Sequence, residues 1–152
     1  MSNKATKRIA KEIMITKKKA PKGCSGAPED SSDLFTWLLK IAGPSGTPYE
    51  GGMFVFRMKL PENYPFKTPD VVAITKIYHP NVSNKDGTIC LQFLHDWKPT
   101  CMIHKLISEL QELLRHPAPE KALDAEIGKA YSTDKSHFDK TAASWTKKHA
   151  KK

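Results

Sequence analysis

The chain has 152 residues, of which 39% are hydrophobic and 9% aromatic. That length and composition predict one folded domain over residues 1–152 and exclude a disordered chain. The net charge of +9 favours acidic partners without distinguishing proteins from nucleic acids or membranes. No apolar run approaches the ~18 residues that span a bilayer, and the basic N-terminus lacks the apolar stretch of a secretory signal. We therefore expect no membrane partner.

The N-terminal residues predict an amphipathic helix over residues 4–18. Ala5, Ile9 and Ile13 repeat at helical spacing along one face. The opposite face is basic and carries Lys4, Lys7, Arg8 and Lys11. The simplest interpretation of these cations is a solvated surface. Residues 17–33 then break the pattern with Pro, Gly and Ser, which predicts a loop.

Three β-strands are predicted next, at Leu34–Ile41, Met53–Leu60 and Val71–Thr75. One side of the second strand is apolar and carries Phe54, Phe56, Met58 and Leu60. The segments between the strands are rich in turn formers and leave no room for a helix. Consecutive strands joined in this way pair antiparallel, as a meander.

The segment Tyr78–Lys98 is expected to be mostly irregular, and a long irregular stretch inside a domain is often functional. Thr100 is a candidate cap for the helix that follows. The apolar stripe of that helix consists of Ile103, Leu106, Ile107, Leu110, Leu113 and Leu114. We expect Pro117 and Pro119 to end it.

A last helix is expected to begin near Thr133 or Asp134. One face of it carries Phe138, Ala142, Trp145 and His149. The lysine-rich end, residues 147–152, is expected to extend into solvent. No internal repeat, second core or linker is evident. The chain is therefore expected to be helical at both ends and to form a sheet in the middle.

The cysteines indicate a reducing compartment. Cys24, Cys90 and Cys101 are an odd number and include no CxxC pair. This usage argues against a disulfide framework or a structural zinc site. We therefore expect a protein of the cytoplasm or nucleus that binds no metal.

Cys90 is the strongest candidate for chemistry. It follows a His-Pro-Asn turn and a Gly-containing turn in the run from His79 to Leu91. A cysteine between apolar neighbours is most often a small buried hydrophobe, but turns bring side chains to solvent, where a catalytic thiol must lie. No neighbour is placed to activate it strongly, which would suit an acyl carrier loaded by an activated donor.

Two more residues of this run have structural and functional interpretations. Asn81 can satisfy backbone groups of a turn or direct its amide N–H at an oxyanion, and the sequence leaves both open. We interpret His79 as structural, because a ring before Pro in a turn more often tethers a loop than transfers protons. The clusters Tyr64-Pro65-Phe66 and Trp97-Lys98-Pro99 either pack loops against the core or form a docking patch with a basic rim.

In this order, these segments resemble the ubiquitin-conjugating enzymes. The resemblance covers nearly the whole chain and is carried by KRIAKE, CSGAP, FTW, GPSGTPYEGGMF, YPFKTPDV, YHPN, GTICL, WKP and the final helix with Trp145. Single pieces are weak, but the ordered set is specific. It implies an α+β fold with an N-terminal helix, a four-stranded antiparallel meander sheet and C-terminal helices.

The resemblance also implies an activity. Cys90 would receive ubiquitin from the activating enzyme by transthiolation and pass it to a substrate lysine or a ligase cysteine. Asn81 would stabilise the oxyanion or hold the loop. No bound cofactor is implied, because the activating enzyme consumes the ATP. We expect a monomer.

Further residues match the family's partner surfaces. The helix face that binds the activating enzyme is matched by Lys7 and Lys11, with Arg8 expected to bind ligases. The loops that dock RING, HECT or RBR ligases are matched by Phe66, Lys98 and Pro99. A second ubiquitin contact on the back of the sheet, used by only some members, is matched by Ser25.

The active-site loops, which include His79, depart from the family pattern at two positions. Many members carry an acidic residue two positions after the cysteine, where this chain has Gln92. Many also carry an Asp that orients and deprotonates the incoming lysine, where this chain has Lys121, beside Glu120. A cation there would repel an ammonium group and could not act as that base, although the adjacent Glu120 is a candidate substitute. We therefore expect poor discharge onto lysine and better discharge onto thiols.

Three alternatives remain open. A carrier of SUMO or NEDD8 fits the basic charge, although the loop between Cys90 and Trp97 lacks the longer acidic segment of the SUMO enzyme. A non-catalytic ubiquitin-binding module would lack the cysteine. A nucleic-acid-binding protein also fits the charge, but its aromatic residues would be interleaved with Lys and Arg, so no nucleic-acid partner is expected.

Overall fold

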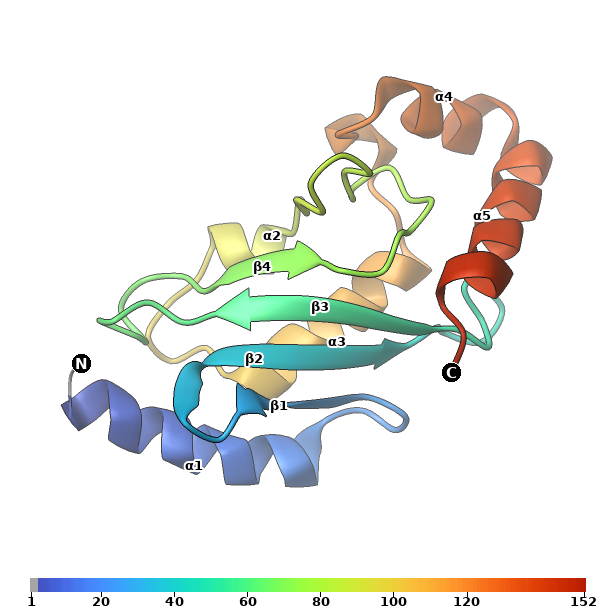
Figure 1. Ribbon diagram of the computed structural model, residues 1–152. Helices are drawn as coiled ribbons and strands as arrows, with labels where there is room; N and C mark the ends of the chain where they lie inside the picture. Colours follow the sequence, from blue (N-terminus) through green and yellow to red (C-terminus); the bar gives the residue numbers. More distant parts are fainter. Residues whose placement is uncertain (1–2) are drawn as a thin grey trace.

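The computed structural model describes residues 3–152 as a four-stranded antiparallel sheet, in the order β1-β2-β3-β4, with helices packed beside it and beyond one end (Figure 1). The elements are α1 (Asn3–Lys19), β1 (Ser25–Asp30), β2 (Asp33–Ala42), β3 (Met53–Lys59), β4 (Asp70–Ala73), α2 (Gln92–His95), α3 (Ile103–Arg115), the short 3-10 helix η1 (Pro119–Lys121), α4 (Ala125–Thr133) and α5 (Lys135–His149). The expected α+β class and meander are confirmed. Within the described chain, no helix is both long and apolar enough to cross a bilayer.

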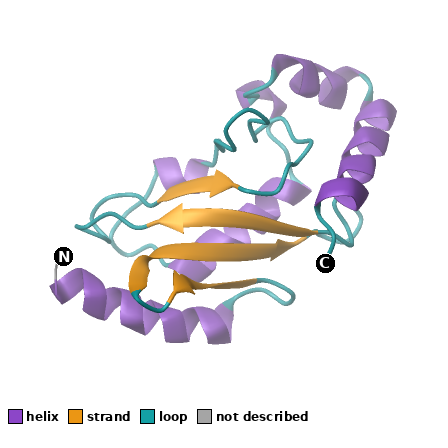
Figure 2. Ribbon diagram, viewed as in Figure 1, coloured by secondary structure: helices purple, strands orange, loops and turns teal. Residues whose placement is uncertain are grey.

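The core lies between the sheet and two helices. α1 and α3 pack on β1 and β2 and on each other, whereas α4 and α5 lie beyond one end of the sheet (Figure 2). The inner face of the sheet buries Phe35, Trp37, Leu39, Ile41, Phe54, Phe56 and Met58. The predicted stripe of α3 is buried along its whole length. The alternating apolar side chains of the strands and the apolar stripe of α3 therefore pack together in one core.

The prediction of a loop over residues 17–33 was wrong, because Ser25–Asp30 forms the edge strand β1. Pairing with β2 overrides the weak strand propensity of this segment. A Cβ at Gly26 would lie 2.9 Å from methyl groups of Leu39 and Ile107, so a larger residue would force these side chains to shift. Pro28 is tolerated on an edge strand, next to an irregularity in the register.

The predicted cap of α3 was also wrong. The helix begins at Ile103 after Met102, and no side chain at the cap position accepts its N–H groups. The acceptor comes from α1 instead, where Glu12 Oε1 lies 2.7 Å from the Ile103 nitrogen. Thr100 lies too early in the chain to cap a helix that starts at Ile103. A carboxylate at a helix N-terminus satisfies a free N–H and complements the helix dipole.

The C-terminal part contains two helices that we did not predict, η1 and α4. Asp124 caps α4 by accepting from the Glu126 and Ile127 N–H groups. The predicted start of α5 is confirmed, with Asp134 as its cap. The expectation that residues 147–152 extend into solvent was wrong for Ala150, which is buried. Its carbonyl accepts the Met53 N–H at 2.9 Å, so the chain end is tied to the start of β3.

Candidate active site

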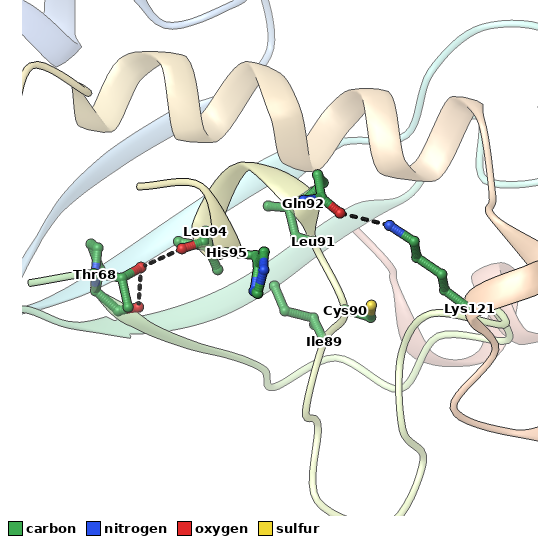
Figure 3. A pocket seen from close by; sticks show the side chains of 9 residues that line it. Thr68, Ile89, Cys90, Leu91, Gln92, Leu94, His95 and Lys121 are labelled. Atoms are coloured by element: carbon green, nitrogen blue, oxygen red, sulfur yellow. Dashed lines mark hydrogen bonds between the residues drawn. The ribbon is translucent and has the colours of Figure 1, made fainter. Parts of the chain in front are cut away.

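Cys90 lies half-buried in an open groove of about 540 Å³. The groove is bounded by Thr68 on one side and Lys121 on the other, with Gln92 and His95 of α2 above the thiol (Figure 3). A bulky acylated donor can therefore reach the sulfur. His95 was not singled out from the sequence, where it lies five residues after Cys90.

The backbone that presents Cys90 is a rigid reversal. The Cys90 N–H donates to the Asn81 carbonyl at 2.9 Å, and isolated β-bridges pair Val82 with Ile89 and Val72 with Thr88. Gly87 completes the turn at φ +77°, where a Cβ would lie 2.2 Å from the Ala73 carbonyl oxygen. Only glycine fits both the positive φ and this close approach.

Asn81 is fully buried, and its amide joins two loops. Its Nδ2 donates to the carbonyls of Ala118 at 2.9 Å and Lys121 at 3.2 Å, and its Oδ1 accepts the Ala118 N–H at 2.8 Å. The amide thus holds the loop that carries Lys121 against the turn that carries Cys90. Of the two interpretations left open by the sequence, this geometry supports loop holding, since an oxyanion would have to displace one of these bonds.

His79 is buried between two backbone groups. Its Nδ1 accepts the Asn81 N–H at 3.0 Å, and its Nε2 lies 2.7 Å from the Leu113 carbonyl oxygen. The neutral ring with its proton on Nε2 satisfies both partners. Burial lowers the pKa of His79 to about 4, although the hydrogen bond to the Leu113 carbonyl acts to raise it. This arrangement supports the structural interpretation of His79.

We expect His79 to reduce stability in acid. Its folded pKa of about 4 lies below the ~6.5 of an unfolded histidine, so between these values the unfolded chain binds a proton that the folded chain does not. The free energy of unfolding should therefore fall as the pH drops from about 6.5, by roughly 3 kcal/mol at about pH 4. Urea titrations across this range measure it. His79→Gln should flatten the slope, and an unchanged slope would assign the acid sensitivity to other groups.

A chain of polar side chains lies along the rim of the groove. Lys121 Nζ donates to Gln92 Oε1 at 2.6 Å (Figure 3). Gln92 Nε2 in turn donates to Asp96 Oδ2 at 3.0 Å. The two positions that depart from the family pattern therefore contact each other. No carboxylate of the described residues lines the groove itself.

The two apolar clusters form one surface. The Trp97 indole N–H donates to the Pro65 carbonyl at 2.8 Å, which ties their loops together. Phe66 is 71% exposed, and Lys98 and Pro99 are also exposed. This surface is separate from the Cys90 groove, although α2 borders both.

The remaining predicted site residues lie at several places. Lys7 and Lys11 are exposed on α1, and Ser25 is exposed on the edge strand β1. Arg8 differs from its neighbours, because its side chain is only 25% exposed and turns towards the 97–102 loop. Cys24 lies away from the groove, and burial raises the pKa of its thiol. Within residues 3–152, no group of three or more His, Cys, Asp or Glu is arranged to hold a metal ion.

Known proteins match this chain along its length. A family model described as "Ubiquitin-conjugating enzyme" matches residues 8–146. The ubiquitin conjugating enzyme E2 B of Dictyostelium discoideum is 40% identical, over 97% of this chain and 99% of its own. The E2 domain of a Toxoplasma gondii ubiquitin conjugating enzyme superposes with a TM-score of 0.89 at 37% identity, covering 96% of this chain and 99% of that one.

A Plasmodium yoelii protein, solved as a candidate ubiquitin conjugating enzyme, covers all of this chain and 99% of its own, with a TM-score of 0.92 and 36% identity. The sequence and structure comparisons thus agree over nearly the whole chain. They favour ubiquitin over the SUMO, NEDD8 and non-catalytic alternatives. The chain belongs to the ubiquitin-conjugating enzyme family, whose members are transferases that carry ubiquitin as a thioester.

Proposed function

We propose that Cys90 is the residue that carries ubiquitin. The Cys90 thiolate attacks the thioester on the activating enzyme, the activating enzyme's cysteine leaves as a thiolate, and the C-terminal carboxyl of ubiquitin is then bonded to Cys90. ATP is consumed by the activating enzyme, so this chain needs no cofactor of its own. The observation that supports the proposal is a half-exposed thiol in an open groove, fixed by the turn that Asn81 and Gly87 stabilise.

Ubiquitin-conjugating enzymes work with ubiquitin, an activating enzyme and ligases, and we propose surfaces of this chain for each. Lys7 and Lys11 on α1 would bind the activating enzyme. Phe66, Lys98 and Pro99 would dock RING, HECT or RBR ligases, because an exposed aromatic ring beside a cation and a proline suits an apolar contact with a basic rim. Ser25 would contact a second ubiquitin on the back of the sheet. We place the protein in the cytoplasm or nucleus, as a monomer.

We further propose that the enzyme, once loaded with ubiquitin on Cys90, transfers it to thiols better than to lysines. An attacking lysine must lose a proton, and the groove lining offers no carboxylate to take it. Lys121 also places a cation on the rim, held there by Gln92. A thiolate acceptor is attracted by that cation, whereas an ammonium group is repelled. Ligases with their own catalytic cysteine, of the HECT or RBR type, are the acceptors that this favours.

The variant Lys121→Asp is expected to raise discharge onto lysine. The carboxylate would supply a base and remove the repulsion, and positioned bases typically contribute about 10²-fold or more. The measurement follows decay of the purified Cys90–ubiquitin thioester with free lysine and with free cysteine in parallel. Lys121→Met removes the charge without adding a base and separates the two causes. Wild-type discharge onto lysine as fast as onto cysteine would refute the selectivity.

The cargo can be tested directly. The protein is incubated with Mg-ATP and with ubiquitin, SUMO or NEDD8, each with its own activating enzyme, and the products are separated without reductant. We expect an adduct with ubiquitin alone that disappears when a thiol is added. An adduct with SUMO or NEDD8 instead would overturn the assignment of the cargo.

A further inference from the structure

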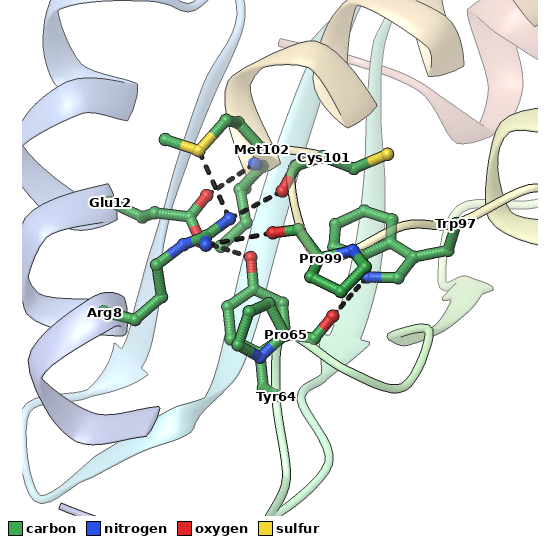
Figure 4. A network of polar contacts seen from close by, with 9 residues as sticks. Arg8, Glu12, Tyr64, Pro65, Trp97, Pro99, Cys101 and Met102 are labelled. Carbon is green, nitrogen blue, oxygen red and sulfur yellow. Dashed lines mark hydrogen bonds and ion pairs between the residues drawn. The ribbon is translucent and has the colours of Figure 1, made fainter. Parts of the chain in front are cut away.

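A partly buried polar network joins α1 to the loop that carries Lys98 and Pro99 (Figure 4). Its centre is the ion pair between Arg8 Nε and Glu12 Oε2, at 2.9 Å. Arg8 Nη1 donates to the Pro99 carbonyl at 3.0 Å, and Arg8 Nη2 donates to the Cys101 carbonyl at 2.7 Å. Arg8 therefore contacts the backbone of the loop at two carbonyls, one on each side of Thr100.

The donors of Arg8 are occupied within the chain. A guanidinium group has five N–H donors, and here its nitrogens contact four acceptors, the fourth being Met102 Sδ at 3.3 Å. The central carbon of the guanidinium, Arg8 Cζ, also lies 5.6 Å from the centre of the Tyr64 ring. Few donors are left for a partner protein, and three quarters of the side chain is covered.

Glu12 fixes the orientation of Arg8. It is 1% exposed, and it accepts the Tyr64 hydroxyl and the Ile103 N–H in addition to Arg8. Burial and the Glu12 carboxylate raise the pKa of Tyr64, so its hydroxyl remains a donor. A buried carboxylate with three donors keeps one geometry, because leaving any donor unpaired costs free energy.

The loop has little else to hold it. Within the turn, the Cys101 N–H donates to the Lys98 carbonyl at 2.8 Å, and the Lys98 N–H lies 3.4 Å from Cys101 Sγ. These contacts close the turn on itself without attaching it to the domain. Trp97, the first residue of the loop, is held by its hydrogen bond to the Pro65 carbonyl. Arg8 attaches the later residues of the loop to α1.

We propose that Arg8 is a positioning residue for ligase docking. It holds the turn at Lys98 and Pro99 beside Phe66 in the shape that a ligase binds, and it does not itself bind the ligase. This inference rests on the proposed docking of ligases at Phe66, Lys98 and Pro99. It replaces the expectation that Arg8 contributes a direct contact.

The test compares Arg8→Lys with the wild type. Lysine keeps the positive charge, but its compact ammonium cannot span two backbone carbonyls as a guanidinium does. Without any ligase, the amide NMR signals of Lys98 and Cys101 should shift and their hydrogen exchange should become faster. In a titration with a HECT domain that binds the wild type, we expect the dissociation constant to rise about tenfold. Lys18→Ala, which removes an exposed charge from α1, is the matched control and should change neither.

Each result bears on the proposal in a different way. Lower affinity with unchanged Lys98 and Cys101 amides would overturn it in favour of a direct contact. Altered amides with unchanged affinity, or no change in either, would overturn it as well. If Arg8→Lys does not fold, the double variant Arg8→Met/Glu12→Gln removes both charges together and leaves an amide oxygen for the Ile103 N–H. Failure of the wild type to form a Cys90 thioester would refute the proposed function instead.

Discussion

With activating enzyme, Mg-ATP and ubiquitin, Cys90→Ala is expected to form no ubiquitin adduct at all. The wild type should form an adduct that reductant removes, because a thioester exchanges with added thiols. Cys90→Ser should form an adduct that resists reductant, since a hydroxyl at the same place gives an oxygen ester. Gel electrophoresis with and without reductant, followed by mass spectrometry of the linkage, measures all three.

The other thiols provide the control. Cys24 directly precedes β1, its Sγ accepts the Ala42 N–H at 3.4 Å, and it does not line the groove. Cys24→Ser should therefore form the ubiquitin thioester to the same extent as the wild type. A linkage mapped to Cys24 or Cys101, or full charging of Cys90→Ala, would contradict the assignment of Cys90.

Local sequence patterns were sufficient to predict those helices and strands that bury one face against the core. The period of 3.6 from Ile103 to Leu114 and the alternation in Met53–Leu60 both depend on neighbours along the chain, and both were confirmed. β1 could not be found in this way. Its residues have low strand propensity, and it forms because residues 37–40 of β2 pair with residues 25–28.

The site shows the same division between local and distant contacts. The turn before Cys90 can be identified from the sequence, because its His-Pro-Asn and Gly are adjacent to the thiol. The contact of Lys121 with Gln92 joins residues 29 positions apart, and the resemblance alone suggested that Lys121 lies near the thiol. His95 has no signal of its own, because a four-residue helix leaves no periodicity to detect.

The cap of α3 is the clearest case of a distant contact. The sequence offers Thr100 as a local cap, but Glu12 takes that role from 91 residues away. Nothing near Ile103 indicates this, since the choice depends on how α1 packs against α3. Glu12 therefore has two roles: it caps the N-terminus of α3, and it orients Arg8.

Glu12→Ala is expected to destabilise the protein by about 3 kcal/mol or more. The substitution leaves the Arg8 guanidinium, the Tyr64 hydroxyl and the Ile103 N–H without their shared acceptor, and breaking a buried ion pair typically costs about 3–5 kcal/mol. For a chain of this size each kcal/mol lowers the Tm by about 2–4 °C, so we expect a fall of roughly 10 °C. Thermal and urea unfolding measure the effect.

A surface glutamate provides the comparison. Glu109 pairs with Lys105 at 3.5 Å on the exposed side of α3, and such pairs contribute about 1 kcal/mol or less. Glu109→Ala should therefore lower the Tm by only a few degrees, although it removes the same charge. Glu12→Gln should fall between the two, because it keeps an oxygen for Ile103 and loses the ion pair. Equal effects of Glu12→Ala and Glu109→Ala would show that the buried network adds nothing to stability, and that α1 and α3 are held together by their apolar faces alone.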